Sequence, residues 1–452
     1  MDSLRTAVER ARRRGDLCFA ALLPEERILK AFGLARVVWQ GWIYSPSITV
    51  WTFLSQCISA DHSCRDAVTR LATWLVLAGR KSCSPETGAY CSARDRIPEE
   101  ACRVLMEDTG RQAEQEAPPS WLWHGRRVRL VDGTTATMPD TAANQAAYPQ
   151  SPSQKPGCGF PIVRIVVLFS LTVGTVLKAA LARCEGKLTG ENSLFRTLHD
   201  SLAAGDVVVG DRCFSGWFDL ALLRQRAVDL VVRKHHLRPT DFRRGRRLGR
   251  EDHLLSWPKP DRPPWMSATQ YATLPDRLEL RELRVHVTQP GFRSDSILVI
   301  TSLLDPEEFS ADELATLYRR RWQAELHLRS IKIVLAMDHL RCLKPHRVRN
   351  EIFMHFTGYN LIRGVMAAAA REANQLPWQV SFKGTMQTLN NLLPILPALL
   401  AQVWCDFLLS CVAAHVVGNR PDRYEPRCKK RRPKKYPRLS KPRADYQKDM
   451  AA

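Results

Sequence analysis

The chain has 452 residues, 45% of them hydrophobic, which suffices for a sizeable core divided among roughly two to four domains. Lysine and arginine number 67 against 46 acidic residues, a net charge of +21, so nucleic acid is the favoured partner and a small neutral substrate is disfavoured. The 13 cysteines include no Cys-x-x-Cys pair, which disfavours a zinc knuckle and indicates reduced core thiols.

The first residues alternate in charge and lack the apolar stretch of a signal peptide, so we expect a cytoplasmic protein. Charged residues and prolines interrupt the two most apolar stretches of the chain. Arg164 and Lys178 break one, and Pro394, Pro397 and Asp406 break the other, so neither predicts a membrane span.

Apolar residues recur at helical spacing through residues 1–107, and the polar, proline-containing segment from Asp108 to Ser120 predicts a linker. We expect residues 1–120 to form a helical, DNA-binding amino-terminal domain. Short β-like runs follow, with a helix predicted over residues 220–228 and strands over residues 128–131, 162–169, 172–177, 207–209 and 230–232. Residues 236–301 are polar, punctuated by proline and partly alternating, and predict a mostly β insertion.

Helical periodicity returns from Ser310 to about Ala373, and Ser310 with Glu313 predicts a capping box at its start. A last apolar helical segment covers residues 392–417. The segment after Gly418 is rich in arginine, lysine and proline, with little to bury, and favours an extended or disordered tail that binds phosphate.

Four polar residues of this long predicted helix share one face. At about 100° per residue, Tyr318, Arg321, Glu325 and Lys332 fall within roughly 60° of one another, on a stripe nearly four turns long. A carboxylate between two cations on such a stripe indicates a polar, charged site. The simpler alternative is that Glu325 forms an intrahelical ion pair with Arg321 or Arg329.

Asp132 and Asp211 each follow a run of β-branched residues, so we expect both carboxylates to project from the carboxyl ends of strands. Together with Glu325 they would supply the oxygen ligands for two Mg²⁺ ions about 4 Å apart, with Mn²⁺ able to substitute. Taken singly, each aspartate also fits an ordinary turn or loop opening. The three carboxylates together, with the basic charge balance, predict phosphoryl transfer on nucleic acid.

The Tyr-x2-Arg-x3-Glu-x6-Lys pattern resembles the signature of the insertion-sequence-four family of bacterial DDE transposases. The segments around the two aspartates also resemble that family: Asp132-Gly133-Thr134-Thr135 and Gly210-Asp211-Arg212-Cys213-Phe214. Similarity extends over residues 144–161 and the basic end, and so over nearly the whole chain. Cys213 departs from the small residue often found there, without affecting the expected catalytic residues.

The resemblance implies an α/β fold with a ribonuclease-H-like mixed-sheet core over residues 121–235 and 302–373. Residues 236–301 would be the mostly β insertion, and residues 374–452 a helical region with a basic tail. In this comparison Asp132, Asp211 and Glu325 are catalytic and bind metal, whereas Tyr318, Arg321 and Lys332 contact DNA. The resemblance also implies a synaptic homodimer acting on transposon terminal inverted repeats and target DNA, in a bacterial protein associated with the nucleoid.

The sequence thus predicts a DNA transposase that cleaves transposon ends and joins the 3′ hydroxyl to target DNA. A structure-selective nuclease on the same fold is the nearest alternative, since it would cut without joining. A catalytically inactive DNA-binding derivative is disfavoured because all three carboxylates are present. A tyrosine recombinase using Tyr318 does not fit, because the spaced arginine and histidine residues of that chemistry are missing around it.

Deleting the chain after Gly418 should weaken DNA binding and flatten its dependence on salt, because about a dozen cations leave with little core. Binding isotherms from low to moderate salt measure both quantities. Unchanged affinity and slope would contradict a phosphate-binding role for the tail.

Overall fold

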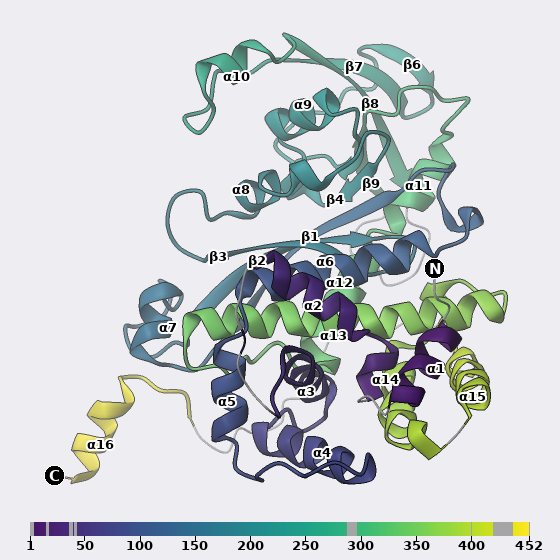
Figure 1. Ribbon diagram of the computed structural model, residues 1–452. Coiled ribbons are helices and arrows are strands. Elements are labelled where there is room, and N and C mark those ends of the chain that lie inside the picture. The colour runs from purple at the N-terminus through teal and green to yellow at the C-terminus, as the bar shows by residue number, and fades with distance from the viewer. Residues whose placement is uncertain are drawn as a thin grey trace.

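The computed structural model describes residues 4–14, 18–35, 39, 43–286, 296–398, 400–418 and 437–451. Within these ranges, nine strands form one mixed sheet with helices on both faces (Figure 1). Alternate residues of the central strands enter two separate hydrophobic clusters. Leu130 and Val209 face the larger cluster, whereas Val131 and Val208 face the smaller one, as expected of buried strands covered on both sides.

The strands are arranged in the order β3-β2-β1-β4-β5-β9-β8-β7-β6. β1 runs parallel to β4 and β4 parallel to β5, whereas every other neighbouring pair is antiparallel. Their bounds are β1 (Val128–Thr137), β2 (Ile162–Ser170), β3 (Val176–Arg183), β4 (Val207–Gly210), β5 (Asp229–Arg233), β6 (Arg246–Gly249), β7 (Asp252–Pro258), β8 (Arg277–His286) and β9 (Ser296–Thr301).

The region before β1 is helical, as its periodicity predicts. Ser45 and Ser63 cap α3 and α4 by accepting hydrogen bonds from the backbone N–H groups of Ile48 and Asp66. The helices are α1 (Leu4–Arg14), α2 (Glu25–Leu34), α3 (Pro46–Ile58), α4 (Cys64–Leu77), α5 (Gly88–Asp95) and α6 (Glu99–Gln115).

The linker predicted from Asp108 is wrong over most of its length, because α6 continues to Gln115. One of its charged residues is held inside the protein: the buried Glu114 accepts hydrogen bonds from Arg129 of β1 and Ser170 of β2. The helix also lies against β3, since a Cβ on Gly110 would be 2.2 Å from the carbonyl oxygen of Val176. Polar composition therefore concealed a helix whose polar groups find partners in the sheet.

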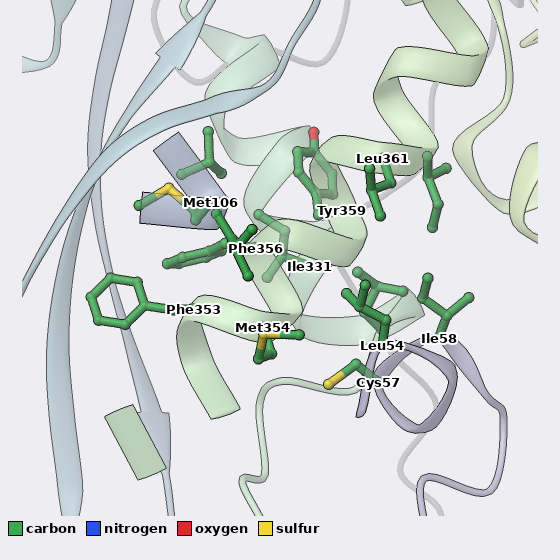
Figure 2. Packing of buried hydrophobic residues seen from close by; sticks show 14 of the residues in the cluster. Leu54, Cys57, Ile58, Met106, Ile331, Phe353, Met354, Phe356, Tyr359 and Leu361 are labelled. Atoms are coloured by element: carbon green, nitrogen blue, oxygen red, sulfur yellow. The ribbon is translucent and has the colours of Figure 1, made fainter. Parts of the chain in front are cut away.

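The longest helix, α13 (Pro345–Glu372), packs under the sheet against α6, α3 and α15 (Ala401–Ala414) (Figure 1). Figure 2 shows Phe353, Phe356 and Tyr359 of α13 gathered with Met106 of α6. The amino-terminal helices, α13, α14 (Phe382–Leu392) and α15 thus share one core with one face of the sheet. The remaining helices are α7 (Ala142–Ala147), α8 (Glu191–Arg196), α9 (Trp217–Gln225), α10 (Ala268–Ala272), α11 (Ala311–Arg319), α12 (Trp322–Arg329) and α16 (Arg443–Ala451).

The mostly β insertion is a continuation of the central sheet. β9 pairs with β5 on one side and with β8 on the other, and β7 and β6 extend the sheet outward. Trp257 of β7 and Leu280 of β8 are buried in the same cluster as Leu230 of β5. Pairing and packing therefore connect the insertion to β5, the neighbour of β4 in the sheet.

The part of the basic tail from residue 419 to residue 436 lies outside the described residues. The prediction of an extended or disordered tail is wrong for its last part, which forms α16. No helix in the described ranges is both long enough and apolar enough to span a bilayer.

Replacing Glu114 by alanine should lower the thermal midpoint by several degrees, because it leaves the buried Arg129 guanidinium with one carboxylate partner fewer. Breaking a buried ion pair typically costs about 3–5 kcal/mol. Thermal unfolding of Glu114→Ala, compared with Glu86→Ala at an exposed position, checks this. Equal midpoints for the two variants would show that the Glu114 contacts contribute little.

Candidate active site

A shallow, open pocket of about 480 Å³ forms where β1, β4 and α12 meet. It brings together the three predicted carboxylates and two of the three predicted DNA-contacting residues. The lining residues are Asp132, Gly133, Asp211, Arg321, Glu325, Leu328, Arg329, Lys332, Ile333 and Asp338.

Asp132 does not lie at the end of its strand, as the sequence suggested, because β1 continues to Thr137. The pairing of β1 with β4 covers only Val128–Leu130, whereas the pairing of β1 with β2 continues to Thr137 at the end of β1. Asp132 therefore lies just beyond the point where β4 stops pairing with β1. There its Oδ1 accepts a hydrogen bond from the backbone N–H of Gly133 at 2.9 Å.

Asp211 follows β4 directly, as predicted. Its Oδ1 accepts a hydrogen bond of 2.7 Å from the backbone N–H of Cys213 and so caps the short 3₁₀ helix Arg212–Phe214. Because β1 and β4 are parallel, the two aspartates lie at the same edge of the sheet. Both aspartates therefore line the same pocket.

The signature residues do not occupy one continuous helix, which corrects the sequence prediction. The predicted capping box of Ser310 and Glu313 is confirmed at the start of α11, but the chain turns at Arg320 and Arg321 before α12. A π-helical turn, Ser330–Val334, then follows α12. Periodicity alone missed these breaks, because apolar residues recur at nearly helical spacing through α11, α12 and the π-helical turn.

Arg321 occupies the N-cap position of α12 and reaches Glu325 one turn later, with its Nη2 2.7 Å from Oε1. This is the intrahelical ion pair that sequence reasoning left open as an alternative. Arg321 is largely buried, with 18% of its side chain exposed, and both residues still line the pocket. The ion pair therefore belongs to the wall of the site.

Lys332 lies in the π-helical turn, and its Nζ is 2.9 Å from Oδ1 of Asp338. Ile331 beside it is fully buried among Phe356 and Tyr359 of α13 (Figure 2). The carbonyl of Asp338 accepts hydrogen bonds from the backbone and side chain of Thr137, at the end of β1. Lys332 is thus fixed between the core and the strand that carries Asp132.

Tyr318 lies behind the pocket wall, where only 5% of its surface is exposed. Burial raises the pKa of its hydroxyl to about 12, whereas the neighbouring guanidinium of Arg321 acts in the opposite direction. The hydroxyl therefore stays protonated and lies beside Arg321. Of the predicted DNA-contacting residues, Tyr318 is the one that the pocket does not expose.

Burial raises the pKa of Asp132 to about 6; the Gly133 N–H and Arg321 oppose this shift, and the charges of Asp211 and Glu325 add to it. The pKa of Arg321 is raised although burial opposes its charge, because Tyr318, Glu325 and Asp132 stabilise the cation. The pocket thus holds more negative charge than Arg321 alone offsets.

A hard divalent cation fits this donor set, because three carboxylates from separate elements face one open pocket. Within the described ranges, no three His, Cys, Asp or Glu side chains are already placed so as to hold a metal ion together. The hydrogen bond between Glu325 and Arg321 gives a physical reason, since it occupies one of the carboxylate oxygens.

Two acidic residues near the site were not found from the sequence. Asp338 pairs with Lys332, and nothing in its local pattern distinguishes it from a loop residue. Glu191, at the start of α8, lies against Gly133: a Cβ on that glycine would be 2.4 Å from Glu191 Oε1. Gly133 therefore allows a further carboxylate to approach β1 next to Asp132.

Comparison with known proteins identifies the class of molecule. Residues 123–361 match the family described as "Transposase DDE domain", and the chain belongs to this family. It is a DNA transposase, an enzyme class that uses divalent metal ions to cleave and transfer DNA strands.

This chain is 27% identical over 403 residues to the transposase InsG of insertion sequence element IS4, from Escherichia coli strain K12. That alignment covers 87% of this chain and 86% of InsG. The transposase of insertion sequence element IS421, from Escherichia coli, is 36% identical over 70 residues, 16% of this chain and 19% of that protein. A solved piggyBac transposase synaptic complex with hairpin DNA aligns with a TM-score of 0.45 and 9% identity, over 90% of this chain and 86% of that one.

Asp132→Asn should stabilise the protein at pH 7.5 in the presence of a chelator. A buried acid with a raised pKa binds its proton more tightly in the folded state, so stability falls as pH rises from about 4 to 6. Asparagine removes this penalty, which is on the order of 3 kcal/mol for a shift of about two pKa units. Thermal midpoints from pH 5 to 8 should therefore show an advantage for the variant that shrinks toward pH 5.

The control is Asp276→Asn, whose side chain is 98% exposed and which should follow the parent at every pH. A difference between Asp132→Asn and the parent that does not change with pH would contradict the raised pKa.

Proposed function

We propose that this transposase cleaves the ends of its transposon and joins the freed 3′ hydroxyl to target DNA, with Asp132, Asp211 and Glu325 as the catalytic carboxylates. The observation that carries the proposal is the convergence of these three side chains, from β1, β4 and α12, on one open pocket. We propose that they hold two Mg²⁺ ions, for which Mn²⁺ can substitute. Such a pair, when bound, supplies activation of the attacking oxygen and stabilisation of the leaving oxygen.

The chain's own cations would position the DNA strand for this reaction. Lys332 and Arg321 flank the carboxylates and would bind the non-bridging phosphate oxygens at the cleavage point. Tyr318 would act on the strand through Arg321, because its hydroxyl lies beside that guanidinium. Arg329 of α12 also lines the pocket and would add a third positive charge beside the DNA strand.

The fold proposed for the catalytic region is ribonuclease-H-like. The order β3-β2-β1-β4-β5, with an antiparallel first half and parallel β4 and β5, supports this assignment. Residues 121–235 and 302–373 would form this core around the insertion of residues 236–301. Residues 1–120 would recognise DNA, and residues 374–452 would add a helical region with a basic tail.

The proposed partners are the terminal inverted repeats of the transposon and the target duplex. The net charge of +21 supports binding to a polyanion along an extended surface. We propose that two copies of the chain act in the synaptic complex, and that DNA binding keeps the protein at the bacterial nucleoid.

A structure-selective nuclease with the same pocket would cut DNA without joining it. A labelled, precleaved end incubated with a supercoiled target distinguishes the two, because only a transposase links the label to the target. A label that stays on the end while cleavage proceeds would favour the nuclease.

Asp132→Asn, Asp211→Asn and Glu325→Gln should each reduce cleavage of an end duplex by about 100-fold or more, because each removes a negative charge from a metal ligand. DNA affinity should be equal or higher, since repulsion of phosphate is reduced. Cleavage by the parent should need Mg²⁺ or Mn²⁺ and should fail with Ca²⁺.

Gel assays of cleavage, filter binding of the duplex and calorimetric Mn²⁺ titration measure these outcomes separately. The matched control is Asp312→Asn, an exposed position on α11. Any of the three variants that kept parental cleavage and Mn²⁺ affinity would have to be removed from the proposed site.

A further inference from the structure

A strongly basic surface lies on the insertion, at the edge of the sheet formed by β6, five strand positions from β4. We call residues 238–250, which connect β5 to β7 and include β6, the basic loop. Arg243 and Arg244 project from it with 91% and 87% of their side chains exposed. The arginines of the basic loop are Arg238, Arg243, Arg244, Arg246, Arg247 and Arg250.

Little negative charge accompanies these arginines. Asp241 is the acidic residue of the loop, and it accepts a hydrogen bond from Arg243 and forms an ion pair with Arg244. Arg246 and Arg247 are exposed on β6. The loop therefore carries a net positive charge on a solvent-facing turn.

A buried ion pair fixes the base of the basic loop. Lys234 and Glu282 have 2% and 1% of their side chains exposed, with Nζ 2.7 Å from Oε1. The same ammonium donates to the carbonyl of Pro239, and the Thr240 hydroxyl donates to Glu282 Oε1 at 2.6 Å. A buried pair satisfied by further hydrogen bonds holds the start of the loop in one conformation.

The middle of the loop is held by β7. His253 Nδ1 lies 2.6 Å from the carbonyl oxygen of Arg244 and donates to it, and its ring packs 4.9 Å from that of Phe242. Gly245 has φ +77°, and a Cβ there would be 2.0 Å from the carbonyl oxygen of Leu254. The exposed guanidinium groups therefore project from a backbone that is already ordered.

We propose that the basic loop is a second DNA-binding surface, which holds the phosphate backbone of a duplex engaged at the active site. The inference rests on the proposed function. Arginines on an ordered turn, opposed by few carboxylates, suit bidentate contact with phosphates and do not themselves read base sequence.

The position of the loop in the sheet sets the expected reach along DNA. β6 is five strand positions from β4, so the loop lies roughly 25 Å from the pocket at about 4.8 Å per strand. At about 3.4 Å per base pair this corresponds to roughly seven base pairs. A duplex that extends at least this far beyond the pocket can contact the loop.

The experiment compares Arg243→Ala/Arg244→Ala with Arg371→Ala/Lys383→Ala in the full-length protein. Both variants lose two exposed positive charges, but the second pair lies on α13 and α14, outside the basic loop. Fluorescence anisotropy without divalent ions measures the affinity for an end duplex between 50 and 200 mM KCl, on the order used to resolve counterion release. We expect the loop variant to bind about tenfold more weakly and its salt slope to fall by about 1 to 2, whereas the control stays within about twofold of the parent.

A second arm identifies the duplex that the loop contacts. Protein loaded with unlabelled end DNA is challenged with labelled random-sequence duplex as the target. Weaker binding in the first arm assigns the loop to transposon ends, and a defect confined to the second arm assigns it to target DNA. Either result supports the proposal. If both arms match the charge-matched control, the proposal is overturned.

The thermal midpoint of each variant is measured first, and Arg246→Ala/Arg247→Ala serves as a second loop variant if the first unfolds. A failure of the proposed function can be told apart from a failure of this inference. If the proposed function is wrong, the parent protein does not cleave end DNA, whereas both binding measurements can still be made.

Discussion

Two separate attachments along one edge of β1 determine where the active site can form. Before the site, Val128–Leu130 pair with β4; after it, Thr137 pairs with the backbone of Asp338 and Leu340. Among the described residues, no strand pairs with this edge in the interval between these two points. Because Asp132 lies in that interval, a side chain from α12 can approach it, and the loop after the π-helical turn fixes how far α12 stands from the strand. The pocket is thus a gap in the ladder of the sheet, closed by a helix.

The charges of the pocket follow from this geometry. Bringing Glu325 toward Asp132 and Asp211 in a partly buried space disfavours the ionised form of Asp132, and burial is the largest cause of its raised pKa. Arg321 compensates for part of this cost, because it pairs with Glu325 and is stabilised by Asp132. The remaining negative charge favours a bound cation. Without a bound cation, the repulsion between these carboxylates lowers the stability of the folded protein. Such a cost is typical of functional sites.

The sequence located most of the central strands, but it placed the strand predicted over residues 172–177 too early, since β3 is Val176–Arg183, and it ended β1 before Asp132. It also missed the shape of the helix that completes the site. Asp211 at a strand end and the capping box at Ser310 depend on local patterns, which short-range chemistry determines. The break before α12 and the π-helical turn do not, because the burial of Ile331 against α13 and the attachment of Asp338 to β1 impose them. Likewise α6 extends past the predicted linker because Glu114 finds partners that are distant in the sequence. Contacts between distant segments have no local signature.

The insertion affects the site through its attachment to both the sheet and the signature helices. Arg281 of β8 is almost fully buried; it pairs with Asp252 of β7 and donates to the carbonyl of Phe309, directly before the cap of α11. The insertion sheet therefore holds the start of the segment that leads to α12. On its other side it orders the backbone of the basic loop through Lys234 and Glu282. Both buried ion pairs lie in one continuous sheet, so the insertion contacts the basic loop on one side and the segment that leads to α12 on the other.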